Sequence, residues 1–261
     1  MYKPIKDDTH SDYHSVKKLA KESMRNGVWE NRCDERFEVF LERMMRSDLS
    51  RESIQSISAG KNYMHYLGVP MAKDPLDKAI YEMLMYEIQP KTIIELGAYT
   101  GASACWLADT MKHYGCETQV IAVDIDLSLI DEKFKDHPHV QFREGDCHKI
   151  ETLFPVAELK ELLHPVLLID DAHVNLPTVY DYFHDQCLQT GDYLIIEDTN
   201  PAIPGTFGMS TDGANDWGDW KHREIIEFFQ RRGEDYRVDT YYTDFFGYNG
   251  TWNWNGFIRR M

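Results

Sequence analysis

Apolar residues follow two different spacings along the chain, and the spacing changes near residue 92. In the first ninety residues, apolar side chains recur every three or four positions. Two sets show this spacing: Phe37, Phe40, Leu41 and Met44, and Leu76, Ile80, Leu84 and Ile88. The spacing predicts amphipathic helices, with the Gly-, Pro- and aromatic-rich segment 60–75 as a loop between them. We therefore expect an N-terminal helical extension and lid over residues 1–75.

From residue 92 onward, short continuous apolar runs replace the helical spacing. The runs are Thr92–Leu96, Val120–Val123, Val140–Phe142, Val166–Ile169 and Tyr193–Ile196. Continuous runs are typical of strands that are covered on both faces. Helical stretches, such as 102–112 and 178–187, separate several of these runs. This alternation predicts an α/β fold over residues 76–261, with a Rossmann-like, doubly wound and mostly parallel sheet.

The end of the chain carries two further apolar runs, Val238–Tyr242 and Gly256–Arg259. They predict an antiparallel C-terminal hairpin at the sheet edge, which brings the expected sheet to seven strands. The Gly- and Trp-containing stretch 199–222 is interpreted as a functional loop. The aromatic residues between 241 and 254 are compatible with a substrate pocket, a sheet-edge core or an oligomer interface, and the sequence leaves these alternatives open.

Composition narrows the classes of protein that need to be considered. The 261 residues are 43% hydrophobic and 28% charged, which is an ordinary globular composition. The formal net charge of −16 and the lack of a Lys/Arg-dense stretch disfavour a nucleic-acid partner. We find neither a signal-peptide core nor an apolar stretch of membrane-span length, so no membrane partner is expected. The five scattered cysteines lack CxxC spacing and favour a reduced, cytoplasmic setting.

A glycine turn follows the first predicted strand, in the sequence ELGAYTGAS (95–103). In open α/β sheets, ligands bind at the carboxyl ends of the strands. Gly97 and Gly101 would let the backbone approach such a ligand closely, and the helix that begins after Gly101 would offer free N–H groups. The turn therefore predicts a cofactor site, with a simple connecting turn as the alternative interpretation.

Acidic residues at the next two strand ends indicate which cofactor this is. Asp124 ends the second predicted strand, where a carboxylate can accept both ribose hydroxyls of a nucleoside. Asp146, with Cys147 after it, follows the third strand and is placed to meet an adenine edge. Glu95 would repel a diphosphate but could hold the ammonium of a methionine moiety, and the GxGxxG series of dinucleotide sites is missing. The pattern favours S-adenosylmethionine (SAM) over a nicotinamide cofactor.

Carboxylates also follow the fourth and fifth predicted strands, in Asp170-Asp171-Ala-His173 and Glu197-Asp198. Adjacent parallel strands would bring these termini together, and crowded carboxylates repel one another unless they are protonated or bridged by a cation. An all-oxygen set suits Mg²⁺. We expect Asp170, Glu197 and Asp198 as metal ligands, whereas Asp171 is explained more simply as a cap of the following turn.

His173 lies three residues beyond Asp170, at the mouth of the expected metal site. A nearby cation disfavours the charged form of an imidazole, which keeps it available as a base at neutral pH. We therefore interpret His173 as the catalytic base that takes a proton from a hydroxyl of a small-molecule substrate.

In the glycine turn and in the acids that follow the fourth and fifth predicted strands, the sequence resembles the metal-dependent class I O-methyltransferases. ELGAYTGAS is similar to the cofactor motif of catechol O-methyltransferase, and this resemblance implies Glu95, Tyr99 and Ser103 as cofactor contacts. We also expect Asp170 among the cofactor-binding residues. The set formed by Asp170 and the 197–198 pair is similar to the metal triad of that family.

A histidine stands at position 173, where that family has a catalytic lysine. This histidine, the Glu-Asp pair and the segment GVPMAKDPLD (68–77) resemble the cephalosporin hydroxylase (CmcI-like) and macrolide sugar O-methyltransferase group. The resemblance covers roughly residues 60–200. It implies a Mg²⁺-assisted O-methyltransferase that acts on a hydroxyl of a natural-product or sugar-like molecule, and we also expect a homo-oligomer.

Three alternatives remain open. The chain could be a metal-independent methyltransferase that acts on nitrogen or on protein, with the acids serving only structure. It could also be a non-catalytic SAM-binding partner protein. A nicotinamide oxidoreductase is the third alternative, which Glu95 and the missing GxGxxG disfavour.

Overall fold

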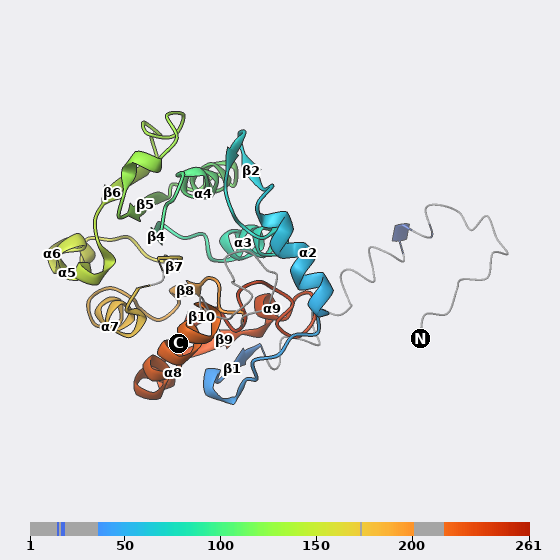
Figure 1. The fold of residues 1–261 in the computed structure, drawn as a ribbon. Helices are drawn as coiled ribbons and strands as arrows, with labels where there is room; N and C mark the ends of the chain where they lie inside the picture. Colours follow the sequence, from blue (N-terminus) through green and yellow to red (C-terminus); the bar gives the residue numbers. More distant parts are fainter. Residues whose placement is uncertain (1–14, 16, 19–35, 173, 201–216) are drawn as a thin grey trace. The chain divides into compact units, whose positions relative to one another are not determined.

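We analysed the fold in a computed structural model, which describes residues 15, 17–18, 36–172, 174–200 and 217–261. Its contacts divide the chain into two compact units, residues 1–36 and residues 37–261. The second unit contains all the strands of the described chain (Figure 1). The domain boundary expected between residues 75 and 76 stays a prediction.

An eight-stranded sheet forms the centre of the second unit (Figure 1). Its spatial order is β1-β9-β10-β8-β7-β4-β5-β6. The strands from β8 to β6 pair in parallel, whereas β10, β9 and β1 join antiparallel. The strands are β1 Phe37–Glu38, β4 Thr92–Leu96, β5 Gln119–Asp124, β6 Val140–Glu144, β7 Val166–Asp170, β8 Tyr193–Ile196, β9 Tyr236–Asp239 and β10 Phe257–Arg260. The predicted doubly wound, mostly parallel sheet is confirmed.

Helices cover both faces of this sheet. The α-helices of the second unit are α2 Arg51–Lys61, α3 Pro75–Ile88, α4 Ala102–His113, α5 Ile150–Leu153, α6 Val156–Leu159, α7 Leu176–Gln186, α8 Trp217–Arg232 and α9 Thr240–Thr243. Residues of α3 and α4 share one core cluster with Ile93, and residues of α7 and α8 share another with Ile94. Because neighbouring strand residues point to opposite faces, β4 is buried on both sides, as its continuous apolar run predicts.

Local sequence explains where the two helices nearest the site begin. The Asp74 carboxylate caps α3 by accepting from the backbone N–H groups of Leu76 and Asp77, and Pro75 occupies its first turn. Such a cap stabilises a helix by about 1 kcal/mol. Helix α4 begins after Gly101, whose φ of 78° is left-handed and therefore favours glycine.

The structure differs from the sequence-based expectation at the sheet edge. The predicted antiparallel C-terminal pair is confirmed as β9 and β10, which pair with each other, but α9 lies between them in the chain and β10 also pairs with β8. Strand β1 pairs with β9 and adds an eighth strand outside the predicted seven. The helical spacing around Phe40 was misleading, because the Phe40 ring stacks on Phe229 of α8 at 4.3 Å and is buried from a short 3-10 turn (Phe40–Glu42).

The segment 60–75 is more ordered than the expected loop. It contains the end of α2 and a small antiparallel hairpin, β2 (His65–Tyr66) and β3 (Val69–Pro70). The Tyr66 hydroxyl donates to Asp109 of α4 at 2.6 Å, and Thr100 donates to the carbonyl of Pro70 at 2.6 Å. These contacts fix the hairpin beside the glycine turn.

Candidate active site

A pocket of about 190 Å³ opens at the carboxyl ends of the parallel strands. It brings together four of the residues predicted to bind the cofactor: Gly97, Asp124, Asp146 and Cys147. They come from the ends of β4, β5 and β6, which are neighbours in the sheet. The pocket therefore lies at the carboxyl ends of the parallel strands, where ligands bind in open α/β sheets.

The two pocket carboxylates are held by local backbone amides. Asp124 accepts from the N–H of Tyr99 at 2.7 Å and from the N–H of Asp126 at 3.1 Å. Asp146 accepts from the N–H of His148 at 2.9 Å, and this hydrogen bond lowers the pKa of the Asp146 carboxyl. Backbone amides thus fix both carboxylates as hydrogen-bond acceptors at the pocket edge.

Close packing explains the two glycines of the turn. A Cβ at Gly97 would stand 2.7 Å from the carbonyl oxygen of Asp171, and a Cβ at Gly101 would stand 2.9 Å from the Phe142 ring. Both residues also have left-handed φ values, 98° and 78°. The protein's own backbone therefore requires these glycines, in addition to any approach by a ligand. Between them, Tyr99 is also left-handed and its side chain is exposed.

Glu95 and Ser103, the other residues of the motif, are buried, with relative exposures of 0% and 5%. Neither carboxylate oxygen of Glu95 accepts a hydrogen bond from a described residue. Its nearest counter-charge is the Lys73 ammonium at 3.5 Å. Burial raises the pKa of Glu95 to about 7, although Lys73 opposes this shift. An unsatisfied buried carboxylate of this kind suits a cationic ligand group.

The strand ends that carry the acids of β7 and β8 are neighbours in the sheet. These strands are parallel neighbours, and the N–H of Glu197 donates to the carbonyl of Asp170 at 3.0 Å. The Asp170 carboxylate accepts from the Tyr180 hydroxyl at 2.5 Å and from the N–H of Ala172 at 3.1 Å. Asp170 is 1% exposed and Glu197 is 4% exposed, so both strand ends lie inside the protein.

A buried lysine that the sequence analysis did not single out connects these acids. The Lys73 ammonium lies 2.6 Å from Oε1 of Glu197 and 3.1 Å from Oδ2 of Asp171. Oε1 of Glu197 also accepts from the Tyr81 hydroxyl. Burial alone would lower the pKa of Lys73, but the charges of Asp171, Glu197 and Glu95 raise it well above its ordinary value.

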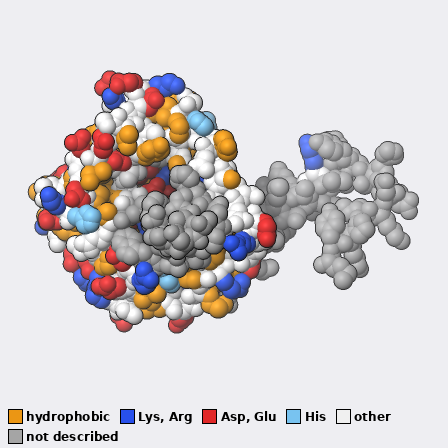
Figure 2. Space-filling model, in the orientation of Figure 1, with side chains coloured by type: hydrophobic (Ala, Val, Ile, Leu, Met, Phe, Trp, Pro, Cys, Tyr) orange, Lys and Arg blue, Asp and Glu red, His pale blue; other side chains and the backbone are white. Residues whose placement is uncertain are grey.

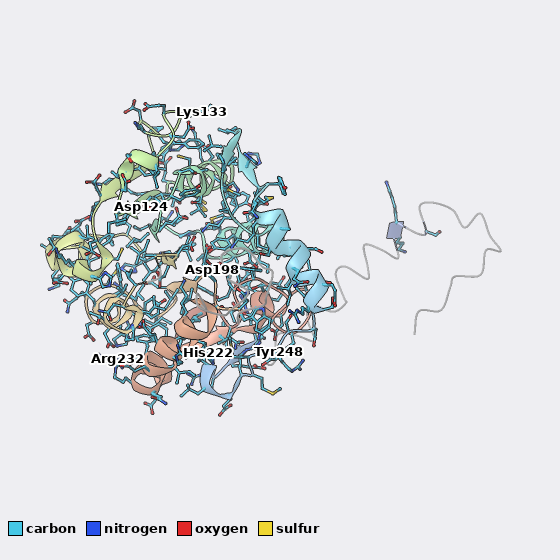
Figure 3. All side chains as sticks on the ribbon, in the orientation of Figure 1. Asp124, Lys133, Asp198, His222, Arg232 and Tyr248 are labelled. Atoms are coloured by element: carbon cyan, nitrogen blue, oxygen red, sulfur yellow. The ribbon has the colours of Figure 1, made fainter. Side chains whose placement is uncertain are left out.

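Asp198 has its own lysine. The Lys61 ammonium lies 3.0 Å from Oδ1 of Asp198, which also accepts from the indole N–H of Trp252. Lys61 stands 4.6 Å from the centroid of the Trp252 ring. The Asp198 backbone is left-handed (φ 54°), and its N–H donates to Asn253 at 2.9 Å. In Figure 3, Asp124 is labelled beside β5 and Asp198 near the middle of the molecule.

The donor chemistry of this cluster fits a divalent cation, although no group of three His, Cys, Asp or Glu side chains in the described part of the chain is arranged as a metal site. Carboxylates of Glu95, Asp171, Glu197 and Asp198 face the ammonium groups of Lys61 and Lys73, and Asp170 ends the strand beside Glu197. A third buried lysine, Lys221 of α8, donates to the carbonyl of Glu197 at 2.6 Å. The acids outnumber the lysines, so additional positive charge would be stabilised here. The metal-ligand set stays a prediction.

Two predicted features lie outside the described residues: His173, and the part of the 199–222 loop from 201 to 216. The aromatic tail divides between two places. Trp252 and Trp254 pack with Ile54 of α2 in a small buried cluster. Tyr241, Tyr242 and Phe245 line a separate groove of about 590 Å³ with residues of α3.

The surface shows two further properties. On the face seen in Figure 2, Lys and Arg side chains are scattered among acidic ones. No helix among the described residues is long and apolar enough to cross a membrane.

Comparison with known proteins places these features in context. A family model described as Rhamnosyl O-methyltransferase/CmcI matches residues 60–261. The rhamnosyl O-methyltransferase of Mycobacterium leprae (strain TN) is 28% identical over 207 residues, which cover 76% of this chain and 84% of that protein. The enzyme of the same name from Mycobacterium tuberculosis (strain H37Rv) is 26% identical over 203 residues, which cover 75% and 77%.

Solved structures of CmcI are also similar. The Mg-SAM structure of CmcI is 31% identical with a TM-score of 0.62, covering 77% of each chain. The S-adenosylhomocysteine (SAH) structure of CmcI is 30% identical with a TM-score of 0.59, covering 76% of this chain and 82% of that one.

Proposed function

The chain belongs to the Rhamnosyl O-methyltransferase/CmcI family and is a SAM-dependent O-methyltransferase, and we propose that it methylates a hydroxyl of a sugar-like or natural-product molecule with the help of Mg²⁺. The observation that carries this proposal is the row of acids at five consecutive parallel strand ends. Those of β5 and β6 border the pocket, and those of β4, β7 and β8 gather around buried lysines. The named relatives support a sugar hydroxyl as the acceptor.

The pocket residues bind the methyl donor in this proposal. Asp124 accepts from the ribose hydroxyls and Asp146 meets the adenine edge, because both carboxylates are held as hydrogen-bond acceptors at the pocket rim. Glu95 attracts the cationic methionine end, since its buried carboxylate gains a counter-charge there.

Asp170, Glu197 and Asp198 would hold Mg²⁺, which supplies Lewis acidity at the acceptor oxygens when bound. His173, which lies in sequence between the pocket residues Ala172 and Val174, accepts the hydroxyl proton on an imidazole nitrogen. The acceptor oxygen then forms a C–O bond with the methyl group as the bond between that methyl and the SAM sulfur breaks. Much of the acceleration comes from alignment of these reactants.

The test measures methyl transfer from labelled SAM to a panel of rhamnosides, other glycosides and catechols, before and after metal removal. We expect EDTA to abolish turnover and Mg²⁺ to restore it. His173→Ala should lower turnover by about 10²-fold or more with little change in SAH affinity, whereas His113→Ala on the exposed end of α4 should not. Wild-type turnover by the His173 variant would exclude this residue as the base.

One observation favours a second candidate, a metal-independent methyltransferase. Lys61 and Lys73 already neutralise part of the negative charge of the acidic cluster. In this alternative the acids form structural ion pairs with the two lysines and bind no metal. Full activity in EDTA, with no response to added Mg²⁺, would support this candidate and contradict the metal-assisted one.

A further inference from the structure

Lys73 is a buried lysine whose ammonium contacts three carboxylates instead of the single partner of a simple ion pair. It precedes the Asp74 cap of α3, in the segment that joins β3 to this helix, and its side chain is 5% exposed. A buried ammonium is costly to desolvate, so proteins retain one where several acceptors compensate for it.

Those acceptors come from three different strand ends. Glu197 follows β8, Asp171 follows β7 and Glu95 belongs to β4. The ammonium lies 2.6 Å, 3.1 Å and 3.5 Å from their respective oxygens. Lys73 therefore links the proposed metal acids to the cofactor motif through one charged group.

The contacts on Glu197 show how this lysine acts on the proposed metal site. The partners of its carboxylate among the described residues, Lys73 and Tyr81, both bind Oε1. With Oε1 fixed from two sides, the orientation of Oε2 is determined as well. Glu197 is thereby oriented by groups that belong to α3 and to the segment before it.

We propose, on the basis of the proposed function, that Lys73 is a positioning residue: an internal cation that orients Glu197 and competes electrostatically with Mg²⁺ for the acidic cluster. It keeps the cluster assembled before the metal binds and limits the affinity for the metal. Removing its charge tightens Mg²⁺ binding while it slows turnover, because Glu197 loses its orientation.

The experiment compares the full-length protein with Lys73→Met, and with Lys78→Met as the matched control. Lys78 lies on α3 and pairs with Glu82 outside the cluster. Calorimetry with MgCl₂ gives the metal affinity, and thermal melts with EDTA or with Mg²⁺ give stability. Lys73→Met should bind Mg²⁺ about tenfold more tightly, as expected when one unit charge is removed at close range. It should melt several degrees lower in EDTA and gain more from Mg²⁺ than the wild type does.

Two further variants protect the test against a folding defect. Lys73→Gln removes the charge but keeps a hydrogen-bond donor for Glu197, so it should bind Mg²⁺ as tightly as Lys73→Met and lose less turnover. Lys73→Met combined with Glu197→Gln should melt above Lys73→Met in EDTA, because the carboxylate left unpaired is also removed. Single variants that fold only when Mg²⁺ is present support the proposal, whereas variants that stay unfolded at saturating Mg²⁺ overturn it.

The remaining outcomes separate the two proposals. Mg²⁺ binding to the wild type with unchanged or weaker affinity in both Lys73 variants would overturn the role of Lys73 alone. If MgCl₂ gives no binding heat and no thermal shift with the wild type, the metal-assisted function itself fails.

Discussion

Two sets of strand-end acids lie side by side in this protein and are stabilised in different ways. At the pocket edge, Asp124 and Asp146 accept from backbone amides of nearby residues and keep one side open. Deeper in the protein, Glu197 and Asp198 are held by the ammonium groups of Lys73 and Lys61, more than a hundred residues away in the chain. The first set is preorganised by backbone amides of the loops around the pocket, and the second depends on side chains that the tertiary fold brings in from distant segments.

The largest expected effect is the loss of turnover when Glu197, an acid of the deeper set, is replaced. Glu197→Gln keeps a hydrogen-bond acceptor for Tyr81 and Lys73 but removes a charge. We expect turnover to fall about 10³-fold, because Lewis-acid stabilisation is worth several kcal/mol. SAH affinity, measured by calorimetry, should change little. Equal losses in the exposed Glu161→Gln control would contradict this assignment.

A second prediction concerns the stability of the same set. Lys61→Met leaves Asp198 without its ammonium partner in a mostly buried location. We expect a loss of about 3 kcal/mol in the free energy of unfolding, the order found when one member of a buried pair is removed. Urea denaturation measures it, with the exposed Lys112→Met as a control. A loss below about 0.5 kcal/mol would place the pair among ordinary surface ion pairs.

Changing an acid at the pocket edge should weaken SAH binding and leave the stability of the fold nearly unchanged. Asp124→Ala removes the acceptor that the Tyr99 and Asp126 amides hold in place. SAH binding should weaken by about 10- to 100-fold, as expected for charge-assisted hydrogen bonds. Calorimetry should find little change for Asp126→Ala, whose carboxylate caps only the short turn Leu127–Leu129. Unchanged affinity in Asp124→Ala would remove Asp124 from the cofactor site.

The smallest expected effect is the pH dependence of stability that comes from Glu95, which lies between the two sets of acids. Its pKa of about 7 in the folded protein exceeds the ordinary value of 4.5, so the folded state binds the proton more tightly. The contribution of Glu95 to stability therefore declines as pH rises from 4.5 through 7, and the loss is complete above 7. Ligand-free protein should lose about 2–4 °C in melting temperature for each kcal/mol that Glu95 ceases to contribute across this window. Glu95→Gln should lose less, and identical profiles would contradict the shifted pKa.

The same comparison explains what the sequence could predict. Continuous apolar runs identified β4 to β8, and the acids after them were found because position after a strand is a local property. The proximity of Glu197 to Asp170 followed from parallel pairing of adjacent strands. Asp171 was interpreted as a turn cap, but its carboxylate also contacts Lys73.

The residues that were missed act over long sequence separations. Nothing near Lys61 or Lys73 distinguishes either from a solvated lysine, and the resemblance of the 68–77 segment was the only signal near Lys73. Strand β1 was missed because two residues carry no periodicity, and its pairing with β9 is decided by tertiary contacts.

The position of the two lysines has a consequence for anyone who wishes to divide or recombine proteins of this kind. Both precede α3, so a fragment that starts at the predicted boundary, residue 76, would retain all five acids and neither of these counter-charges. A chimera that exchanges the segment before α3 would exchange part of the electrostatics of the proposed metal site as well. The smallest transplantable unit therefore begins at or before the Lys61 end of α2.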